Sequence, residues 1–379
     1  MPGVKKLHQE SESSTKSEYI MGHMFGGVGV LIGEAGKKLF CVLLSMRLHE
    51  GINAIMGWKH DEPHDEDSHV VKIIQDAGSI ANIIGASILL LDRLYLTVPM
   101  LRTLAMTPLL KVVTKAKSNA TAYLDPKPRK GRGAKARKGE KVKVFEYLRS
   151  HTAEMVTTAV YAYGEVQAVS YYSADLQWGL KWYQKLRFVL VYLNGREAVL
   201  VSTDLTMTPE QIIELYCLRF KIECSFRELK QVVAGFCYRF WSKYMPKLKR
   251  YKSNEVNQEQ VSAVTEANAR KRIEDCVKAI HGYALFGCIA LGMLQMISLS
   301  FSSMFNDNVV RFMRTKSNIA PSEATVADFI RRNIYQLFRF HPDLPLTDTI
   351  KSKQLVIDDR LYDQSTAQYD DSDIYSKSA

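Results

Sequence analysis

The protein has 379 residues, of which 46% are hydrophobic and 24% are charged. These proportions exclude a wholly disordered chain, a collagen-like repeat and a small disulfide scaffold. The 51 Lys and Arg residues outnumber the 40 Asp and Glu residues, and the formal net charge of +11 indicates a polyanionic partner, with nucleic acid first and an anionic membrane surface second. A basic protein without such a partner is the alternative that charge alone leaves open.

The first 114 residues predict the beginning of an α/β domain. Residues 1–19 are polar, and we expect them to be irregular. The elements expected after them are strands at 24–33 and 38–46, a helix at 70–84, a buried strand at 87–91, a short helix opened by Pro99 and a buried strand at 109–113. The run at 87–91 is continuously apolar, which is typical of a strand in the middle of a sheet, and it ends directly before Asp92.

The composition changes between residues 115 and 205. Residues 127–143 contain nine basic side chains, one acidic side chain and three glycines, which predicts a solvated loop that can contact DNA phosphates. Three β-rich segments follow at 156–173, 185–193 and 197–202. Their order predicts an antiparallel β insertion between the two halves of the α/β domain.

Residues 206–233 predict an amphipathic helix with two distinct faces. Thr208 is a suitable N-cap, Pro209 suits the first helical position, and Gln211 completes a capping box. At about 100° per residue, a narrow polar stripe lies beside the apolar face and consists of Tyr216, Arg219, Glu223, Arg227 and Lys230. In such a stripe the carboxylate can bind a metal ion while the neighbouring cations bind phosphate oxygens. A helix face with salt bridges on the protein surface explains the same pattern.

The C-terminal third contains a long apolar run and a polar tail. Residues 282–306 carry no charge and are numerous enough to span a bilayer, but they include Gln295 and several serines and glycines. We therefore expect a buried core helix rather than a membrane-spanning one. Residues after about 340 are polar and acidic, and we expect them to be disordered.

The six cysteines form no C-x-x-C pair, and no apolar signal segment begins the sequence. Both features favour reduced thiols and a cytoplasmic protein.

The polar stripe carries a family resemblance. Tyr216, Arg219, Glu223 and Lys230 spell Y-x2-R-x3-E-x6-K over fifteen positions, which resembles the signature of one large group of insertion-sequence transposases. The text LLLDRLYLTVPMLRTL around Asp92 resembles that family's segment for its second catalytic Asp. Further likeness extends the resemblance over residues 20 to 300.

The resemblance implies both a fold and an activity. The implied fold is α/β, a ribonuclease-H-like core with an inserted antiparallel β region between the fifth core strand and the Glu-bearing helix. Asp92 and Glu223 would be catalytic ligands of two Mg²⁺ ions, and Tyr216, Arg219 and Lys230 would grip DNA next to the scissile phosphate. The implied reaction is nicking at transposon ends and strand transfer into target DNA, by a homodimer in a transposition complex within a prokaryotic, nucleoid-associated cytoplasm. No small-molecule substrate is implied.

One part of the family pattern is missing from the sequence. The core needs a first strand that carries the first catalytic Asp, but the text before residue 24 contains neither an apolar strand nor an Asp. Glu10, Glu12 and Glu18 lie in no strand-like text and are poor substitutes. We therefore expect an N-terminally truncated chain with a compromised catalytic site. The alternatives are a non-catalytic DNA-binding remnant that inhibits a full-length transposase, and a membrane-associated basic protein.

Two further groups of residues suggest chemistry less specifically. The acidic stretch 58–69 contains His60, His64 and His69 and could chelate a metal ion, but a solvated surface loop explains it better. Trp178 and Trp182 lie in the insertion, where aromatic rings either stack on a flipped base or pack on a sheet, and we favour packing.

These patterns predict five regions. They are an irregular segment at 1–19, the first part of the core at 20–114, the β-rich insertion at 115–205, the second part of the core with the Glu223 helix and the apolar helix at 206–305, and a C-terminal helical segment with the acidic tail at 306–379.

Overall fold

The computed structural model describes most of the chain between residues 4 and 340. The described residues are 4–8, 15, 18–34, 37–49, 68–127, 136–240, 242–245, 264–305 and 320–340. The acidic tail, most of the 58–69 stretch and residues 128–135 of the basic loop lie outside them.

Two antiparallel hairpins form the N-terminal part. The strand β1 (Lys5–His8) pairs with β2 (Tyr19–Gly22), and β3 (Met24–Glu34) pairs with β4 (Lys38–His49). The expectation of a wholly irregular segment at 1–19 is therefore wrong for β1. Its four residues, KKLH, are too few to show an alternating pattern, and the pairing that satisfies their main-chain groups comes from β2.

A helix and two parallel strands follow the second hairpin. They are α2 (His69–Ile84), β5 (Ser87–Leu90), the short 3₁₀ helix η1 (Arg93–Tyr95), α3 (Val98–Ala105) and β6 (Leu110–Lys115). The strands β5 and β6 are parallel because α3 carries the chain back between them. The helix α3 begins at Thr97, whose side chain accepts a hydrogen bond from the Met100 amide.

The inserted region is antiparallel, as expected, but it extends the sheet that begins with β5 and β6. Its elements are β7 (Thr121–Tyr123), β8 (Lys141–Lys143), α4 (Val144–Arg149), the 3₁₀ helix η2 (Thr152–Glu154), β9 (Val156–Ala162), β10 (Glu165–Trp178), β11 (Gln184–Leu193) and β12 (Arg196–Ser202). The strand order is β5-β6-β12-β11-β10-β7-β8, with β9 also paired to β10. A tight turn at Asn194–Gly195, where both residues have positive φ, joins β11 to β12.

The helices of the last part are α5 (Pro209–Leu218), α6 (Phe220–Gln231), α8 (Ala267–Ser300), the 3₁₀ helix η3 (Ser302–Phe305) and α9 (Glu323–Phe340). The predicted capping box is present, because Thr208 and Gln211 exchange side-chain and main-chain hydrogen bonds. The predicted single helix is divided at Arg219, whose amide bonds to the carbonyl of Tyr216 in a tighter turn than an α-helix makes.

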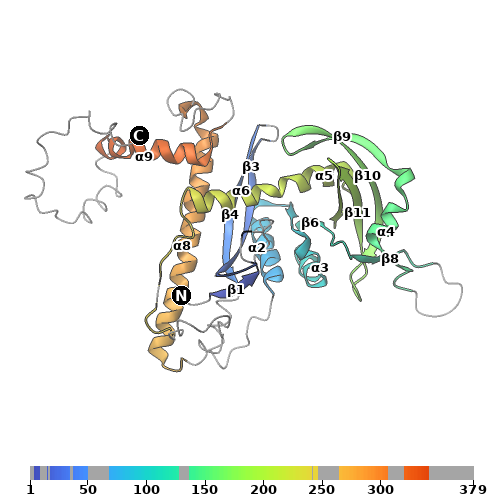
Figure 1. Ribbon diagram of the computed structural model, residues 1–379, viewed down its shortest axis with the longest axis horizontal. Helices are drawn as coiled ribbons and strands as arrows, with labels where there is room; N and C mark the ends of the chain where they lie inside the picture. The colour runs from blue at the N-terminus through green and yellow to red at the C-terminus, as the bar shows by residue number, and fades with distance from the viewer. Residues whose placement is uncertain are drawn as a thin grey trace, which may run out of the picture.

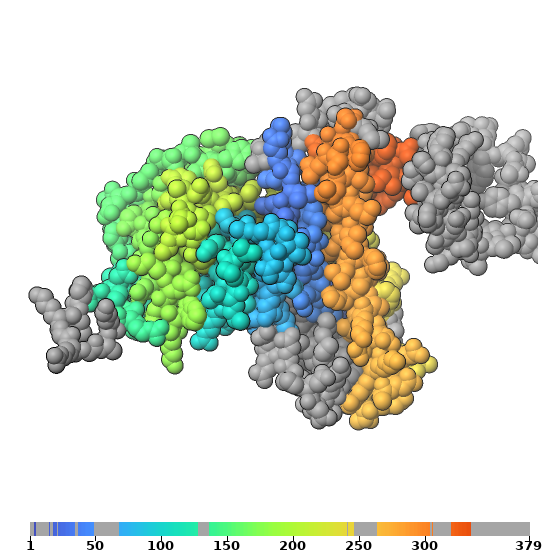
Figure 2. Space-filling view, turned by 180° about the vertical axis from the view of Figure 1, so that it is seen from behind, coloured from blue at the N-terminus to red at the C-terminus, as the bar shows by residue number. Residues whose placement is uncertain are grey.

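The helices cover both faces of the strands (Figure 1). The helices α2 and α3 pack on one face, whereas α5, α6 and α8 pack on the other. The largest cluster of buried apolar side chains lies between α2, α3, α4 and the main sheet. Figure 2 shows the long helix α8 beside the β3–β4 hairpin, with the inserted strands on the opposite side of the molecule. The fold is thus a mixed α/β architecture with a many-stranded sheet.

Within the described residues, α8 is the one helix that is long and apolar enough to cross a membrane. Its polar side chains nevertheless bond to the rest of the protein. Gln295 donates to Glu323 and Ser225, and Ser298 donates to the carbonyl of Pro321. Such buried polar contacts are typical of a helix in a protein core.

Candidate active site

Asp92 lies directly after β5, at the end of the strand that the sequence predicted. Its carboxylate accepts a hydrogen bond of 2.5 Å from the Arg93 amide and caps η1. Its carbonyl accepts a hydrogen bond of 2.9 Å from the Thr114 hydroxyl on the neighbouring strand β6. Sequence reasoning missed Thr114, although a hydroxyl within the buried run KVVTK was a usable signal. The two bonds fix Asp92 at the end of the sheet.

Glu223 and Arg219 form an ion pair one helical turn apart. The Nη2 atom of Arg219 lies 2.5 Å from Oε1 of Glu223, and about half of the Glu223 side chain is exposed. Burial by itself would lower the pKa of Arg219. Its hydrogen bond with Glu223 and the charge of that residue outweigh burial, and the charges of Tyr216 and Asp92 contribute, so that the pKa of Arg219 lies above its usual value. The carboxylates of Asp92 and Glu223 therefore act on the same guanidinium.

Tyr216 lies near Arg219 and Asp92, on the last turn of α5. Burial raises the pKa of its phenol to about 12, with a contribution from the charge of Asp92 and an opposing one from Arg219. The hydroxyl is therefore protonated at neutral pH and can donate a hydrogen bond to an anionic oxygen.

Lys230 and Arg227 belong to a different part of the stripe. The ammonium of Lys230 lies 6.0 Å from the centre of the Phe236 ring, and Arg227 forms a 2.8 Å ion pair with Glu228. Lys230 is seven residues beyond Glu223, which is about 10 Å along a helix axis. Of the predicted stripe, Arg219 and Glu223 line the cavity beside Asp92, whereas Lys230 lies about two turns farther along α6 and does not line it.

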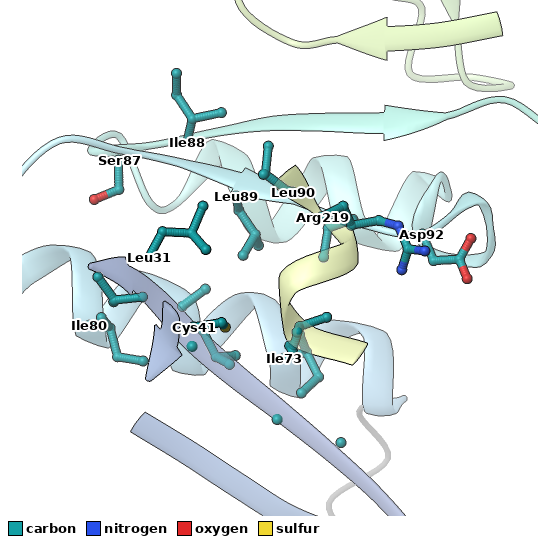
Figure 3. A pocket seen from close by; sticks show the side chains of 18 of the residues that line it. Leu31, Cys41, Ile73, Ile80, Ser87, Ile88, Leu89, Leu90, Asp92 and Arg219 are labelled. Carbon is teal, nitrogen blue, oxygen red and sulfur yellow. The ribbon is translucent and has the colours of Figure 1, made fainter. Parts of the chain in front are cut away.

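Asp92, Arg219 and Glu223 lie at one end of a cavity of about 480 Å³. The cavity separates β3 from β5, with α2 on one side and the first turns of α6 on the other. Figure 3 shows Asp92 and Arg219 together at one end, and Ser87 with Ile88 at the other end of the strand. Between these ends the lining is apolar, and its side chains include Leu31, Cys41, Ile73, Ile80 and Leu89. Sequence reasoning did not foresee this cavity.

The chemistry of the carboxylates suits a divalent metal ion, but their number is small. Mg²⁺ prefers oxygen ligands and is commonly held by carboxylates. Among the residues that the structure describes, no group of three or more His, Cys, Asp or Glu side chains is placed to hold a metal ion. Asp92 and Glu223 alone are too few protein ligands to fix two ions, so the donor set fits only part of the predicted site.

The remaining candidates have different outcomes. His69, the one histidine of the acidic stretch in the described part of the chain, begins α2 and packs edge-on against Tyr95. Trp182 donates a hydrogen bond to Gln184 and lies against the core together with Trp178, which matches the favoured packing role. In the described part of the basic loop, Lys138 lies over the rings of Tyr123 and Tyr183.

Comparison with known families identifies the domain. Residues 61–239 match the family model described as the transposase DDE domain, and the matched segment includes α2, β5, the insertion, α5 and α6. This segment is therefore similar to transposase DDE domains. The predicted resemblance to DDE transposases is confirmed at the level of this family, and the family generally uses divalent metal ions. Among curated proteins, no sequence matches the chain significantly.

Proposed function

We propose that the protein acts on DNA as a transposase whose catalytic end is formed by Asp92 and Glu223. One observation carries the proposal: Asp92, after a strand, and Glu223, on a helix from a distant part of the sequence, line the same cavity together with Arg219, which bonds Glu223. The finer fold that we propose for this arrangement is a ribonuclease-H-like core with an antiparallel insertion.

The residues at this end suit a phosphodiester substrate. One N–H group of Arg219 donates a hydrogen bond to Glu223, and the guanidinium has further N–H donors. A guanidinium can donate hydrogen bonds to two phosphate oxygens at the same time. Tyr216 would donate a hydrogen bond to a neighbouring phosphate oxygen, since burial keeps its phenol protonated. Lys230 would contact the DNA backbone farther along α6 as a point charge.

In the reaction we propose, a water or 3′-hydroxyl oxygen attacks the phosphorus and the bond to the leaving 3′ oxygen breaks. Divalent ions, when bound, supply Lewis-acid stabilisation of the charge on these oxygens. Asp92 and Glu223 would hold them, and Arg219 would orient the phosphate. Because the described residues supply only two carboxylates at this end, which are too few to fix two ions, we infer that the protein binds DNA but cleaves it poorly.

Two assays on the purified protein test this proposal. A nicked duplex should bind, and the same duplex with Mg²⁺ should be cut at least roughly a thousandfold more slowly than by an active transposase, since the contribution of one ion is worth several kcal/mol. Absence of DNA binding at low salt would contradict the proposed function. Rapid Mg²⁺-dependent nicking that Glu223→Gln abolishes would support the proposed site and contradict the inferred slow cleavage.

The second candidate function is a DNA-binding protein that competes with an active transposase without cutting DNA. The described residues place only two carboxylates, Asp92 and Glu223, at the cavity, and this small number favours the second candidate. A strand-transfer assay that mixes the protein with an active transposase of the same end specificity distinguishes the competitor from the transposase. A pure competitor lowers the yield of strand transfer and stays inactive under every metal condition.

A further inference from the structure

The long helix α8 has two opposite faces, and only one of them is covered by the rest of the protein. The covered face packs on the β3–β4 hairpin, α6 and α9, and its buried side chains are Ala284, Cys288, Leu291, Gln295 and Ser298. The opposite face, called here the exposed α8 face, consists of Phe286, Ile289, Met293 and Met296, which are 51–74% exposed. A helix that is apolar all round is normally enclosed by neighbours, so the exposed α8 face is expected to take a partner.

The exposed α8 face adjoins a groove between α8 and β4. The groove has a volume of about 480 Å³, and Leu44 of β4 adds a side chain that is 49% exposed. Figure 2 shows α8 at the surface beside the β3–β4 hairpin. The exposed parts of Leu44 and the exposed α8 face amount to roughly 500 Å², so two copies packed through them would bury about 1,000 Å², which reaches the size of a specific protein interface.

The absence of charge distinguishes this surface in a strongly basic molecule. Residues 279–300 of α8 contain no Asp, Glu, Lys or Arg, whereas the chain has a net charge of +11. Two copies repel each other through their net charge, and the repulsion is smallest where they meet through a surface without charges. A charged partner such as DNA would lose hydration there and gain no ion pair. The surface therefore suits a second copy of the chain.

The spacing of the exposed α8 face is symmetric about its centre. Successive side chains are three, four and three residues apart, and the midpoint lies at Leu291. Helices pack on each other through apolar side chains at this spacing. With a two-fold axis at the midpoint the helices are antiparallel, so that Phe286 of one copy faces Met296 of the other and Ile289 faces Met293. The first contact joins an aromatic ring to a thioether, which is a favourable pair.

The charges at the start of α8 favour this antiparallel direction. Lys271 and Arg272 are exposed and precede the midpoint by about twenty residues, which is about 30 Å along a helix axis. In an antiparallel pair the cations of the two copies lie at opposite ends, about 60 Å apart, where salt screens their repulsion. In a parallel pair they would lie side by side. The helix dipoles also favour the antiparallel direction.

We propose that a second copy of the chain packs on the exposed α8 face and on Leu44, and that the two α8 helices cross antiparallel at Leu291 in a symmetric dimer. The proposal assigns a contact surface and a helix direction, neither of which the family resemblance implies. It does not rest on DNA binding and goes beyond the proposed function.

Sedimentation of the full chain without DNA tests the surface. We expect a dimer with a Kd in the micromolar range or tighter, as for an interface of this size. Met293→Lys should weaken the dimer at least about 100-fold, because it buries an unpaired charge beside the axis. The matched change Ile83→Lys, at an apolar side chain of α2 that is 85% exposed, should leave the Kd unchanged. Both replaced side chains are exposed, so circular dichroism should show the same fold in both variants.

The opposite results are equally definite. A chain that stays monomeric at about 100 μM overturns the proposal, and so does a dimer that Met293→Lys leaves intact. A monomer that binds neutral lipid vesicles, and loses that binding in Met293→Lys, would assign the exposed α8 face to a membrane instead. A dimer of a chain that binds no DNA would contradict the proposed function and leave this inference standing, whereas a monomer that binds DNA would do the reverse.

Disulfide cross-linking tests the direction of the helices. Cys237→Ser first removes the exposed cysteine, and Phe286→Cys and Met296→Cys are then made separately in that background. With oxidised glutathione, we expect an equal mixture of the two variants to form at least about tenfold more covalent dimer than either variant alone. In the antiparallel pair, two copies of position 286 lie about 15 Å apart along the axis, which is too far for a disulfide. Equal cross-linking of either variant alone would overturn the antiparallel arrangement.

Discussion

At the scale of single residues, the guanidinium of Arg219 is the centre of the candidate site. It bonds Glu223 and experiences the charge of Asp92, so it holds two carboxylates that would otherwise repel each other. The same group retains donors for a phosphate. Arg227 offers a matched comparison on the same helix, because its partner is Glu228 and it does not line the cavity.

Replacing Arg219 should therefore weaken DNA binding more than replacing Arg227. We expect Arg219→Ala to lower the affinity for a nicked duplex by about 10- to 100-fold, as for loss of a hydrogen bond to a charged phosphate of about 1.5–3 kcal/mol. Arg227→Ala should change it by less than about threefold, as for an exposed cation. Fluorescence anisotropy at fixed salt measures both, and equal losses would show that Arg219 has no special role.

A second residue-scale prediction concerns pH. Tyr171 donates a short hydrogen bond to Glu210, which lowers the pKa of Glu210 below its usual value of 4.5. A lowered carboxyl pKa adds stability that is present above the unfolded-state pKa and is lost as the pH falls through the folded-state pKa. Tyr171→Phe should thus cost about 1 kcal/mol at pH 7 and less below pH 4.5. Urea unfolding across this range measures the difference, and a constant difference would contradict the assignment.

At the scale of elements, the β3–β4 hairpin is held to the first half of the domain by one polar cluster. Asp76, which is buried on α2, accepts hydrogen bonds from Ser45 and from two nitrogens of Arg47, all at 2.5–2.6 Å. The hairpin also packs on α2 through Val28, and on α6 and α8. The cluster therefore sets the position of β3 across the cavity from β5.

Removing the Asp76 carboxylate should loosen that connection. We expect Asp76→Ala to lower the free energy of unfolding by about 1–3 kcal/mol, because it leaves Ser45 and Arg47 without their acceptor. Hydrogen exchange should accelerate in β3 and β4 more than in β11. The exposed change Asp125→Ala, which removes only a surface ion pair with Lys185, should cost less than about 1 kcal/mol. A uniform acceleration in every strand would contradict the local role of Asp76.

At the scale of the whole molecule, the net charge of +11 governs encounter with DNA. Lysines and arginines that neutralise phosphates release counterions, so affinity falls as salt rises. We expect the affinity for a sequence-neutral duplex to fall at least tenfold between about 50 and 200 mM salt, as for several phosphate contacts. Reversal of charge in Lys230→Glu should weaken binding to a nicked end more than Lys138→Ala in the basic loop, whose ammonium lies on two tyrosine rings. Affinity that does not depend on salt would show that the charge serves another purpose.

A second prediction at this scale separates a core helix from a membrane anchor. The bonds of Gln295 and Ser298 to other elements place α8 within the protein, and we expect the protein to remain in solution without detergent. Flotation with anionic vesicles at high salt measures this. Vesicle association that persists at about 1 M salt would mean insertion of the apolar face of α8 rather than attraction of charges.

The sequence alone determined the local features of this protein. Apolar runs located β5 and β6, and the Thr208 cap and its Gln211 partner located the start of α5, because strand burial and capping depend on residues a few positions apart. Asp92 and Glu223 were identified by a family resemblance, which the match over 61–239 supports at the level of the domain. Their roles as catalytic ligands stay predictions.

Only the tertiary structure determined the contacts between these elements and the cavity that they enclose. The pairing of β12 with β6 and the approach of Asp92 to the Glu223 helix depend on contacts between segments that are far apart in the sequence. The sequence did not indicate that β3 and β5 would lie on opposite sides of one apolar cavity. A cavity is defined by elements that pack around it, and no local pattern encodes the space that they leave.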